Sequence, residues 1–151
     1  MKKFTHILPY THYLIASEES AKSYAAAVDL PYRDVADIAM ALAEEPMADS
    51  RRVRHVIITC ADKPTIVSAP WCGHGMKVQM YPVQELRDVS GRPIARTAGS
   101  GVAGNSFAGG LLYALTMGCE IDECINMAHY AARQVLINGD EDIDFANKPE
   151  L

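Results

Sequence analysis

The sequence has no apolar run long enough to cross a membrane and little clustered positive charge. Its 151 residues carry 14 basic and 19 acidic side chains, a formal charge of −5, with no stretch of about 18 uncharged apolar residues. Its first residues, MKKFTH, lack the apolar segment of a secretory signal. The one basic cluster, residues 51–54, is short. We therefore expect an intracellular protein without a transmembrane segment and without a nucleic-acid partner.

The sequence also lacks the cysteine patterns of a zinc site. Cys60, Cys72, Cys119 and Cys124 form no CxxC pair and have no nearby histidine at ligand spacing. We expect reduced, mostly buried thiols and no metal. Such thiols suit any reducing compartment, so the cytoplasm and the mitochondrion both remain open.

What the sequence does contain is an alternation of strand and helix patterns. Apolar residues make up 49% and charged residues 22%, as in an ordinary globular domain. The alternation predicts an α/β layer architecture in one domain over residues 1–151, with an irregular tail at 140–151. The predicted strands span residues 11–16, 55–60, 65–69 and 76–83. The predicted helices span residues 17–28, 33–44 and 120–137, with a further helix that carries Phe107, Leu111, Ala114 and Leu115.

Some elements carry more specific signals. Residues 55–60 are almost continuously apolar, which is typical of a central strand covered on both faces. Ser17 is a predicted N-cap, followed by Glu18 and Glu19 in the first helical turn. The inner face of the 33–44 helix is predicted to be Val35, Ile38, Ala39 and Leu42. That of the last helix is predicted to be Ile121, Cys124, Ile125, Ala128, Ala132, Val135 and Leu136.

A glycine-dense loop precedes the third helix. Gly99, Gly101 and Gly104 fit GxGxxG, but dinucleotide binding needs a following strand that ends in an acid, and here a second helix follows. No Gly-Lys-Ser/Thr completes a P-loop either. Two interpretations stay open: an anion site at the helix N-terminus, or glycines that let a helix pack closely on the sheet, as we expect of Gly109 and Gly110.

Five segments resemble one family in the same order along the chain. Residues 8–13 (LPYTHY) resemble an LPYVDY strand, and residues 55–59 (HVIIT) lie where the family has VIFT. Residues 104–110 (GNSFAGG) are similar to GDAFVGG, residues 123–132 to ECIRAGHYAA, and residues 148–149 to EKPDF. The chain thus resembles the C-terminal half of adenosine kinases, within the ribokinase-like, PfkB kinases. The resemblance implies a Rossmann-like, three-layer α/β/α fold: a partial ribokinase-like fold without the N-terminal substrate and lid half.

The resemblance also implies ATP-dependent phosphorylation of a nucleoside 5′-hydroxyl, with the last Asp of the DTNGAGD loop as general base. Asn105 stands at that position, and a neutral amide cannot take a proton. Losing a general base costs typically about 10²–10⁴-fold in rate. Val102 replaces a glycine, whose loss should reshape the loop. The anion-loop positions are Ser100, Gly101, Ala103 and Gly104.

Two further motifs of the family are altered. Its Asn-x-x-Glu motif, which organises the metal and phosphate region, aligns with Ser17 and Ser20. We favour a helix cap there over a metal-binding role for Glu18 or Glu19. The family's nucleotide-side TxGxxG begins at Thr59, but both glycines are replaced and Asp62 brings an acid toward the expected nucleotide phosphates.

These changes predict a non-catalytic, adenosine-kinase-like pseudoenzyme that acts as a structural subunit of a larger assembly. Because the resemblance begins in mid-fold, we expect a protein partner to cover the sheet edge near residues 11–16. The alternative is the nucleotide-binding half of a split nucleoside kinase; a nucleotide-sensing module is a third possibility. No cofactor is expected, and ATP and magnesium would bind only if nucleotide binding is retained.

Overall fold

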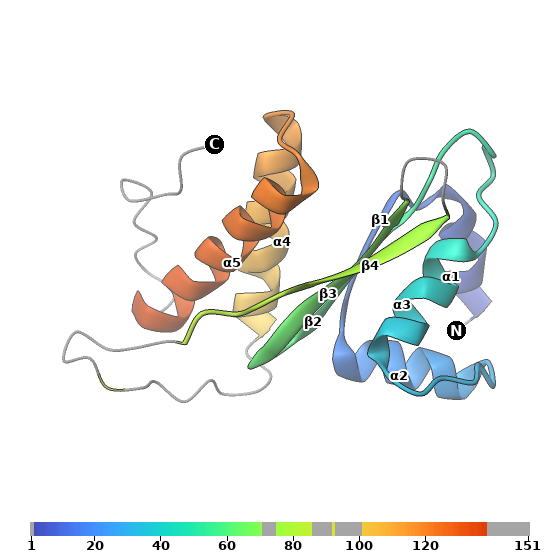
Figure 1. The fold of residues 1–151 in the computed structure, drawn as a ribbon, viewed down its shortest axis with the longest axis horizontal. Coiled ribbons are helices and arrows are strands. Elements are labelled where there is room, and N and C mark those ends of the chain that lie inside the picture. The colour runs from blue at the N-terminus through green and yellow to red at the C-terminus, as the bar shows by residue number, and fades with distance from the viewer. Residues whose placement is uncertain (1, 71–74, 86–91, 93–100, 139–151) are drawn as a thin grey trace. The chain divides into compact units, whose positions relative to one another are not determined.

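A computed structural model describes residues 2–70, 75–85, 92 and 101–138 (Figure 1). The chain divides into two compact units, Met1–Pro82 and Val83–Leu151. They are called the first and second unit below, and each is described by itself.

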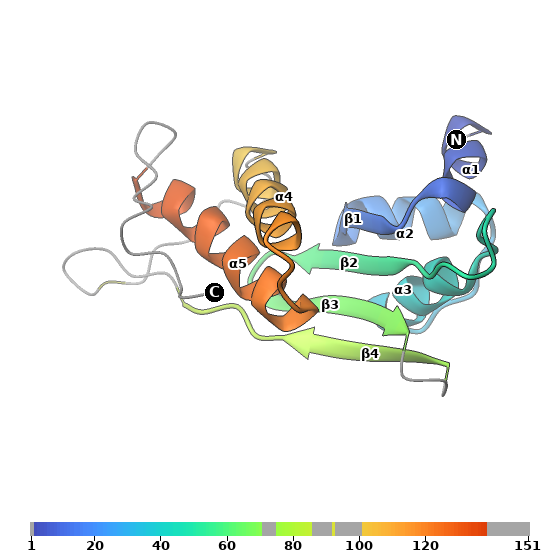
Figure 2. The same ribbon diagram turned by 90° about the horizontal axis from the view of Figure 1, so that it is seen from above.

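The first unit is built on a four-stranded sheet of β1 (Tyr13–Ser17), β2 (His55–Cys60), β3 (Lys63–Pro70) and β4 (Met76–Tyr81). The spatial order is β1-β2-β3-β4, so β2 has a neighbour on each side (Figure 2). β1 runs parallel to β2, whereas β3 and β4 follow as an antiparallel meander. All four predicted strands are confirmed. β3 is longer than the predicted strand 65–69, because it also includes Lys63, Pro64 and Pro70.

Two helices supply the core on one face of this sheet, α2 (Glu18–Ala27) and α3 (Val35–Glu44). The strand register places Val56, Ile58 and Ile66 on that face, and all three are buried in one cluster with the helices. The predicted inner face of α3 is confirmed, because its four residues are all buried: Val35, Ile38, Ala39 and Leu42. A short helix α1 (Lys2–Ile7) and a 3₁₀ turn (Leu8–Tyr10), which the sequence patterns did not predict, precede β1.

A fully buried arginine joins the segments around the start of β2. Arg54 is 0% exposed and donates hydrogen bonds to the backbone carbonyls of Leu8 and Leu42, both at 2.6 Å, and of Glu45 and Thr11, at 3.0 and 3.1 Å. Its charge therefore lies at the C-terminal end of α3, where a cation and the last free carbonyls suit each other.

The second unit contains the helices α4 (Gly101–Thr116) and α5 (Ile121–Asn138), packed against each other. A Cβ atom on Gly110 would lie 2.7 Å from the Met127 carbonyl oxygen and 2.8 Å from the Ala131 Cβ, so only glycine permits this approach. Gly110 thus serves helix-on-helix packing. Gly109 has nothing within 4 Å of its Cβ position and takes no part in the contact between α4 and α5.

The buried face of α5 is slightly rotated from the predicted one. Cys124, Ile125, Ala128 and Val135 are buried as predicted. The predicted Ile121, Ala132 and Leu136 are only half-buried, whereas Met127 and Ala131 are buried instead. The reason is the close contact at Gly110, which draws Met127 and Ala131 toward α4. No helix in the described ranges is long and apolar enough to span a bilayer.

Candidate functional site

The carboxyl ends of β1 and β2 form the best-defined polar site of the first unit. In α/β sheets, ligands bind beyond the carboxyl ends of parallel strands. β1 and β2 are parallel, and Ser17 at the end of β1 lies directly opposite Thr59 near the end of β2. We call Ser17, Glu18, Ser20, Thr59 and Lys63 the carboxyl-end corner.

Ser17 and Ser20 cap α2. The Ser17 Oγ accepts a hydrogen bond from the Ser20 backbone N–H at 3.1 Å and donates to the Ser20 Oγ at 3.0 Å. Ser17 has extended backbone angles, as an N-cap residue requires. The structure therefore confirms the predicted cap. The hydroxyl groups of Ser17 and Ser20 are both hydrogen-bonded within it.

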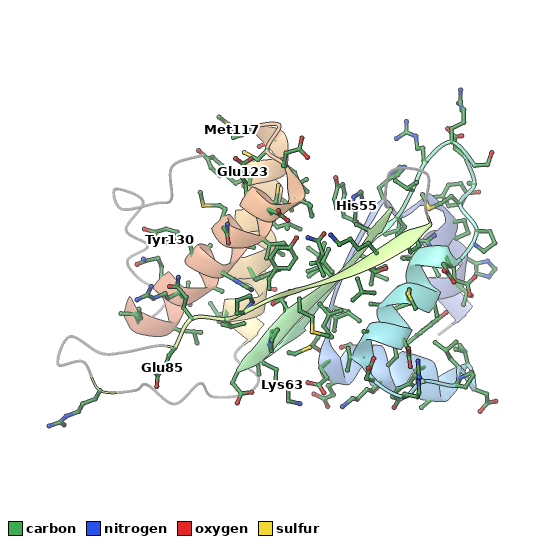
Figure 3. All side chains as sticks on the ribbon, in the orientation of Figure 1. His55, Lys63, Glu85, Met117, Glu123 and Tyr130 are labelled. Carbon is green, nitrogen blue, oxygen red and sulfur yellow. The ribbon has the colours of Figure 1, made fainter. Side chains whose placement is uncertain are left out.

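Glu18 lies between two lysines. Its Oε1 accepts a hydrogen bond from Lys22 Nζ at 2.6 Å and another from Lys63 Nζ at 3.4 Å, which links α2 to the start of β3. Figure 3 labels Lys63. The hydrogen bond from Lys22 is the main reason that the pKa of Glu18 is lowered, and the same bond raises the pKa of Lys22.

This pairing bears on magnesium, the ion that the resemblance implies would bind together with ATP. Magnesium needs free carboxylate oxygens, but the Glu18 carboxylate faces two ammonium groups. Within the part of the chain that the structure describes, no three His, Cys, Asp or Glu side chains are grouped to hold a metal ion. The pairing with two lysines therefore occupies Glu18, one of the two carboxylates considered as metal ligands.

The next two predicted site residues lie near the end of β2 and in the turn that follows it. Thr59 Oγ1 donates a long hydrogen bond of 3.4 Å to the Ala16 carbonyl, and Asp62 lies in the exposed two-residue turn after Cys60. The other turn residue, Ala61, has φ of +52°. Tight hairpin turns require positive φ at this position, which is why glycine is favoured there. Ala61 therefore adopts a backbone conformation that glycine usually occupies in such turns.

The predicted anion loop is only partly described, because Gly99 and Ser100 lie outside the described residues. Gly101 and Gly104 are exposed in the first turns of α4, and Ala103 is half-buried. The first turn of α4 contains no acidic residue. Val102 lies in regular helix; in the described ranges only Asp29 and Ala61 among non-glycine residues have positive φ.

Asn105 is also exposed on α4. It belongs to the second unit, whereas Ser17, Ser20, Thr59 and Asp62 belong to the first. The structure thus brings together Ser17, Ser20 and Thr59 and leaves Asp62 in the exposed turn that follows β2, and it places Asn105 with Gly101, Ala103 and Gly104 on one helix.

The acidic residues that follow the glycine-rich segment lie at the start of α5, and one of them caps this helix. Glu123 Oε2 accepts a hydrogen bond from the Glu120 backbone N–H at 3.0 Å, a capping interaction at the beginning of α5. α5 follows α4 with no strand between them. The predicted second helix after the glycine-rich segment is therefore confirmed.

Sequence patterns missed two features. Arg54 appeared only as one of three arginines in a basic cluster, and nothing in the sequence distinguishes it from its exposed neighbours Arg51 and Arg52. The second is a cavity of about 190 Å³ beside the C-terminus of α3. Its lining comprises Ala43, Glu44, Glu45, Pro46, Met47, Ser50, Arg52, Val53, Arg54 and Met76.

Comparisons with known proteins agree on one family. The sequence profile described as pfkB family carbohydrate kinase matches residues 1–140. The chain is 29% identical to adenosine kinase of Schizosaccharomyces pombe over 130 residues, which is 86% of this chain and 35% of that protein. It is 32% identical to adenosine kinase of Schizophyllum commune over 137 residues, 88% of this chain and 37% of that protein.

Solved structures give the same result. The crystal structure of Anopheles gambiae adenosine kinase, in complex with P1,P4-di(adenosine-5) tetraphosphate, superimposes with a TM-score of 0.76 at 27% identity, covering 99% of this chain and 40% of that one. Ribokinase from Thermotoga maritima has a TM-score of 0.64 at 18% identity over 86% of this chain and 37% of its own, a likeness of fold alone. The chain therefore has part of a ribokinase-like α/β fold and spans between a third and two-fifths of the length of these relatives.

Proposed function

The chain belongs to the pfkB family of carbohydrate kinases and is adenosine-kinase-like, and we propose that it is a non-catalytic member that serves as a structural subunit of a protein assembly. The observation that carries the proposal is the state of the carboxyl-end corner. Ser17 and Ser20 are engaged in a helix cap, and Glu18 is paired with two lysines.

The second unit supports the same proposal through Asn105. Phosphoryl transfer to a hydroxyl group needs a residue that orients the attacking oxygen and takes its proton. An amide can orient a hydroxyl but has no accessible basic form. A chain with Asn105 in place of the family's aspartate is therefore suited to keep the fold of a kinase without the proton transfer.

The experiment is an assay of ATP-dependent adenosine phosphorylation by the purified chain, with adenosine kinase of Schizosaccharomyces pombe as the active reference. We expect no turnover from the chain, and none from Asn105→Asp, because the corner residues are altered as well. Turnover by the unmodified chain would refute the proposal. Native mass spectrometry of the protein isolated from its own cells should show it bound to other protein chains; a stable monomer there would refute the structural role.

The second candidate function is the nucleotide-binding half of a split nucleoside kinase. The observation in its favour is the first turn of α4, in which Gly101, Val102 and Gly104 are exposed and no acidic residue occurs. The N-terminus of such a helix can bind an anion through its free N–H groups. Isothermal titration calorimetry with ATP and ADP distinguishes the two functions, since the structural subunit should release no binding heat at millimolar nucleotide.

A further inference from the structure

Two cysteines lie at the start of α5. Cys119 is the second residue before the helix, and Cys124 is the fourth residue within it. Cys119 is half-buried, Cys124 is 0% exposed, and both are free thiols. Two residues five positions apart do not share a face inside one helix. Because Cys119 precedes α5, that rule does not apply to this pair, and the capping interactions of the helix decide whether the side chains meet.

The cap of α5 brings the two side chains together. Glu120 is the N-cap: its carbonyl accepts a hydrogen bond from the Cys124 N–H at 3.0 Å, and its own N–H donates to Glu123 Oε2. Cys119 and Cys124 therefore occupy the positions N′ and N4. In a capped helix the side chains at these two positions pack against each other as a hydrophobic staple. The Cys124 Sγ accordingly lies 3.5 Å from the carbonyl oxygen of Cys119.

The end of α4 holds the backbone of Cys119. Gly118 has φ of +78°, and the Cys119 N–H donates a hydrogen bond to the Ala114 carbonyl at 3.1 Å, as in a glycine-ended helix. Figure 3 labels Met117 in the same turn. The backbone of Cys119 is thus bound to α4, whereas Cys124 belongs to α5. A bond between the two sulfur atoms would join the two helices at this turn.

We propose that Cys119 and Cys124 form a redox-sensitive dithiol, which a low-molecular-weight disulfide oxidises to a disulfide that joins the end of α4 to the start of α5. Disulfides that form in a reducing compartment are transient and redox-sensing ones. The staple supplies what such a pair needs, because it holds both side chains at one place before any oxidant arrives. Oxidation should therefore stabilise the packing of α4 against α5.

The burial of the two thiols sets the order of the reaction. The Cys119 thiolate attacks one sulfur of the small disulfide, which forms a mixed disulfide and releases one small thiol. The Cys124 sulfur then attacks the Cys119 sulfur, and the second small thiol leaves. The protein loses two electrons and two protons, and the small disulfide gains them. Burial raises the pKa of Cys124, so this thiol does not compete for the reagent in solution.

The test exposes the purified chain to oxidised glutathione, blocks every remaining thiol and maps the bonds by peptide mass spectrometry. Every protein carries Cys72→Ser, because Cys72 lies outside the described residues. We expect a disulfide between Cys119 and Cys124, with Cys60 left free. Cys124→Ala should stop at a glutathione adduct on Cys119, and Cys119→Ser should leave Cys124 unmodified. Cys60→Ala, which removes a buried thiol outside the pair, is the matched control and should still form the disulfide.

A second measurement needs no substitution in the pair, so it remains decisive if a variant fails to fold. The equilibrium constant for forming this disulfide from oxidised glutathione is compared between the folded chain and the chain unfolded in urea. We expect it to be at least about tenfold larger in the folded chain, because folding already brings the two ends of residues 119–124 together. A folded chain without this preference overturns the proposal, as does a glutathione adduct on Cys119 as the end product. The inference does not depend on the proposed structural role, which the kinase assay tests separately.

Discussion

The interiors of the two units of this protein are stabilised in opposite ways. The core of the first unit uses branched side chains on a sheet and one buried arginine that binds four carbonyls. The second unit uses the smallest residue, Gly110, to bring two helices together. The first should therefore fail when a hydrogen-bonding group is removed, and the second when volume is added.

The largest effect is expected from Arg54→Leu in the first unit. It leaves the carbonyls of Leu8, Leu42, Glu45 and Thr11 without their buried donor, at a cost of at least about 3 kcal/mol. Urea unfolding measures this loss, and hydrogen exchange should localise it to residues 2–70. Arg51→Leu is the matched control: the Arg51 side chain is 89% exposed, so its change should stay within about 0.5 kcal/mol. If Arg54→Leu and Arg51→Leu lower the free energy of unfolding equally, the four hydrogen bonds of Arg54 do not have the expected stabilising effect.

The second prediction concerns a substitution that should destabilise the second unit. Gly110→Ala forces a methyl group against the Met127 carbonyl and Ala131, which should cost about 1–3 kcal/mol. Gly109→Ala adds the same methyl group to the same helix where nothing lies within 4 Å, and it should stabilise the protein by about 0.5–1 kcal/mol. Thermal unfolding compares the pair. The same sign for both changes would contradict a close helix contact at Gly110.

The third prediction compares one turn from each unit. Ala61, in the β2–β3 turn, has φ of +52°, and Gly118, after α4, has φ of +78°. Ala61→Gly should raise the free energy of unfolding by about 1 kcal/mol, because glycine adopts positive φ without strain. Gly118→Ala should lower it by a similar amount, although nothing lies within 4 Å of its Cβ position. If Ala61→Gly destabilises the protein, the turn is not strained.

The smallest effect concerns pH and the first unit. Burial lowers the pKa of His55 below its ordinary value of 6.5. As the pH falls below that value, the unfolded chain binds a proton before the folded chain does, so stability decreases until the folded pKa is passed. Urea unfolding between pH 8 and pH 5 should show this decrease. His55→Phe, which keeps an aromatic ring beside Tyr13, should remove part of it; an unchanged pH profile would assign the effect to other groups.

Much of the fold was predictable because local patterns and burial agree. The four strands, the α3 face and the Ser17 cap follow from short-range patterns of apolar and capping residues. For the candidate site, the sequence predicted which residues belong to it but not which of them contact one another. Nothing in the sequence states that Lys63 reaches Glu18, since these residues are 45 positions apart and meet only because β2 and β3 form a hairpin beside α2.

The sequence by itself determined the α/β class, the family resemblance and the substitution of Asn105, Ser17 and Ser20 at the motif positions, because these depend on residue identity and local period. Only the tertiary structure decided that Arg54 is buried, that Gly110 serves helix packing and that Lys63 reaches Glu18. Burial, close approach and strand pairing depend on which distant segments meet, and a linear pattern does not record that.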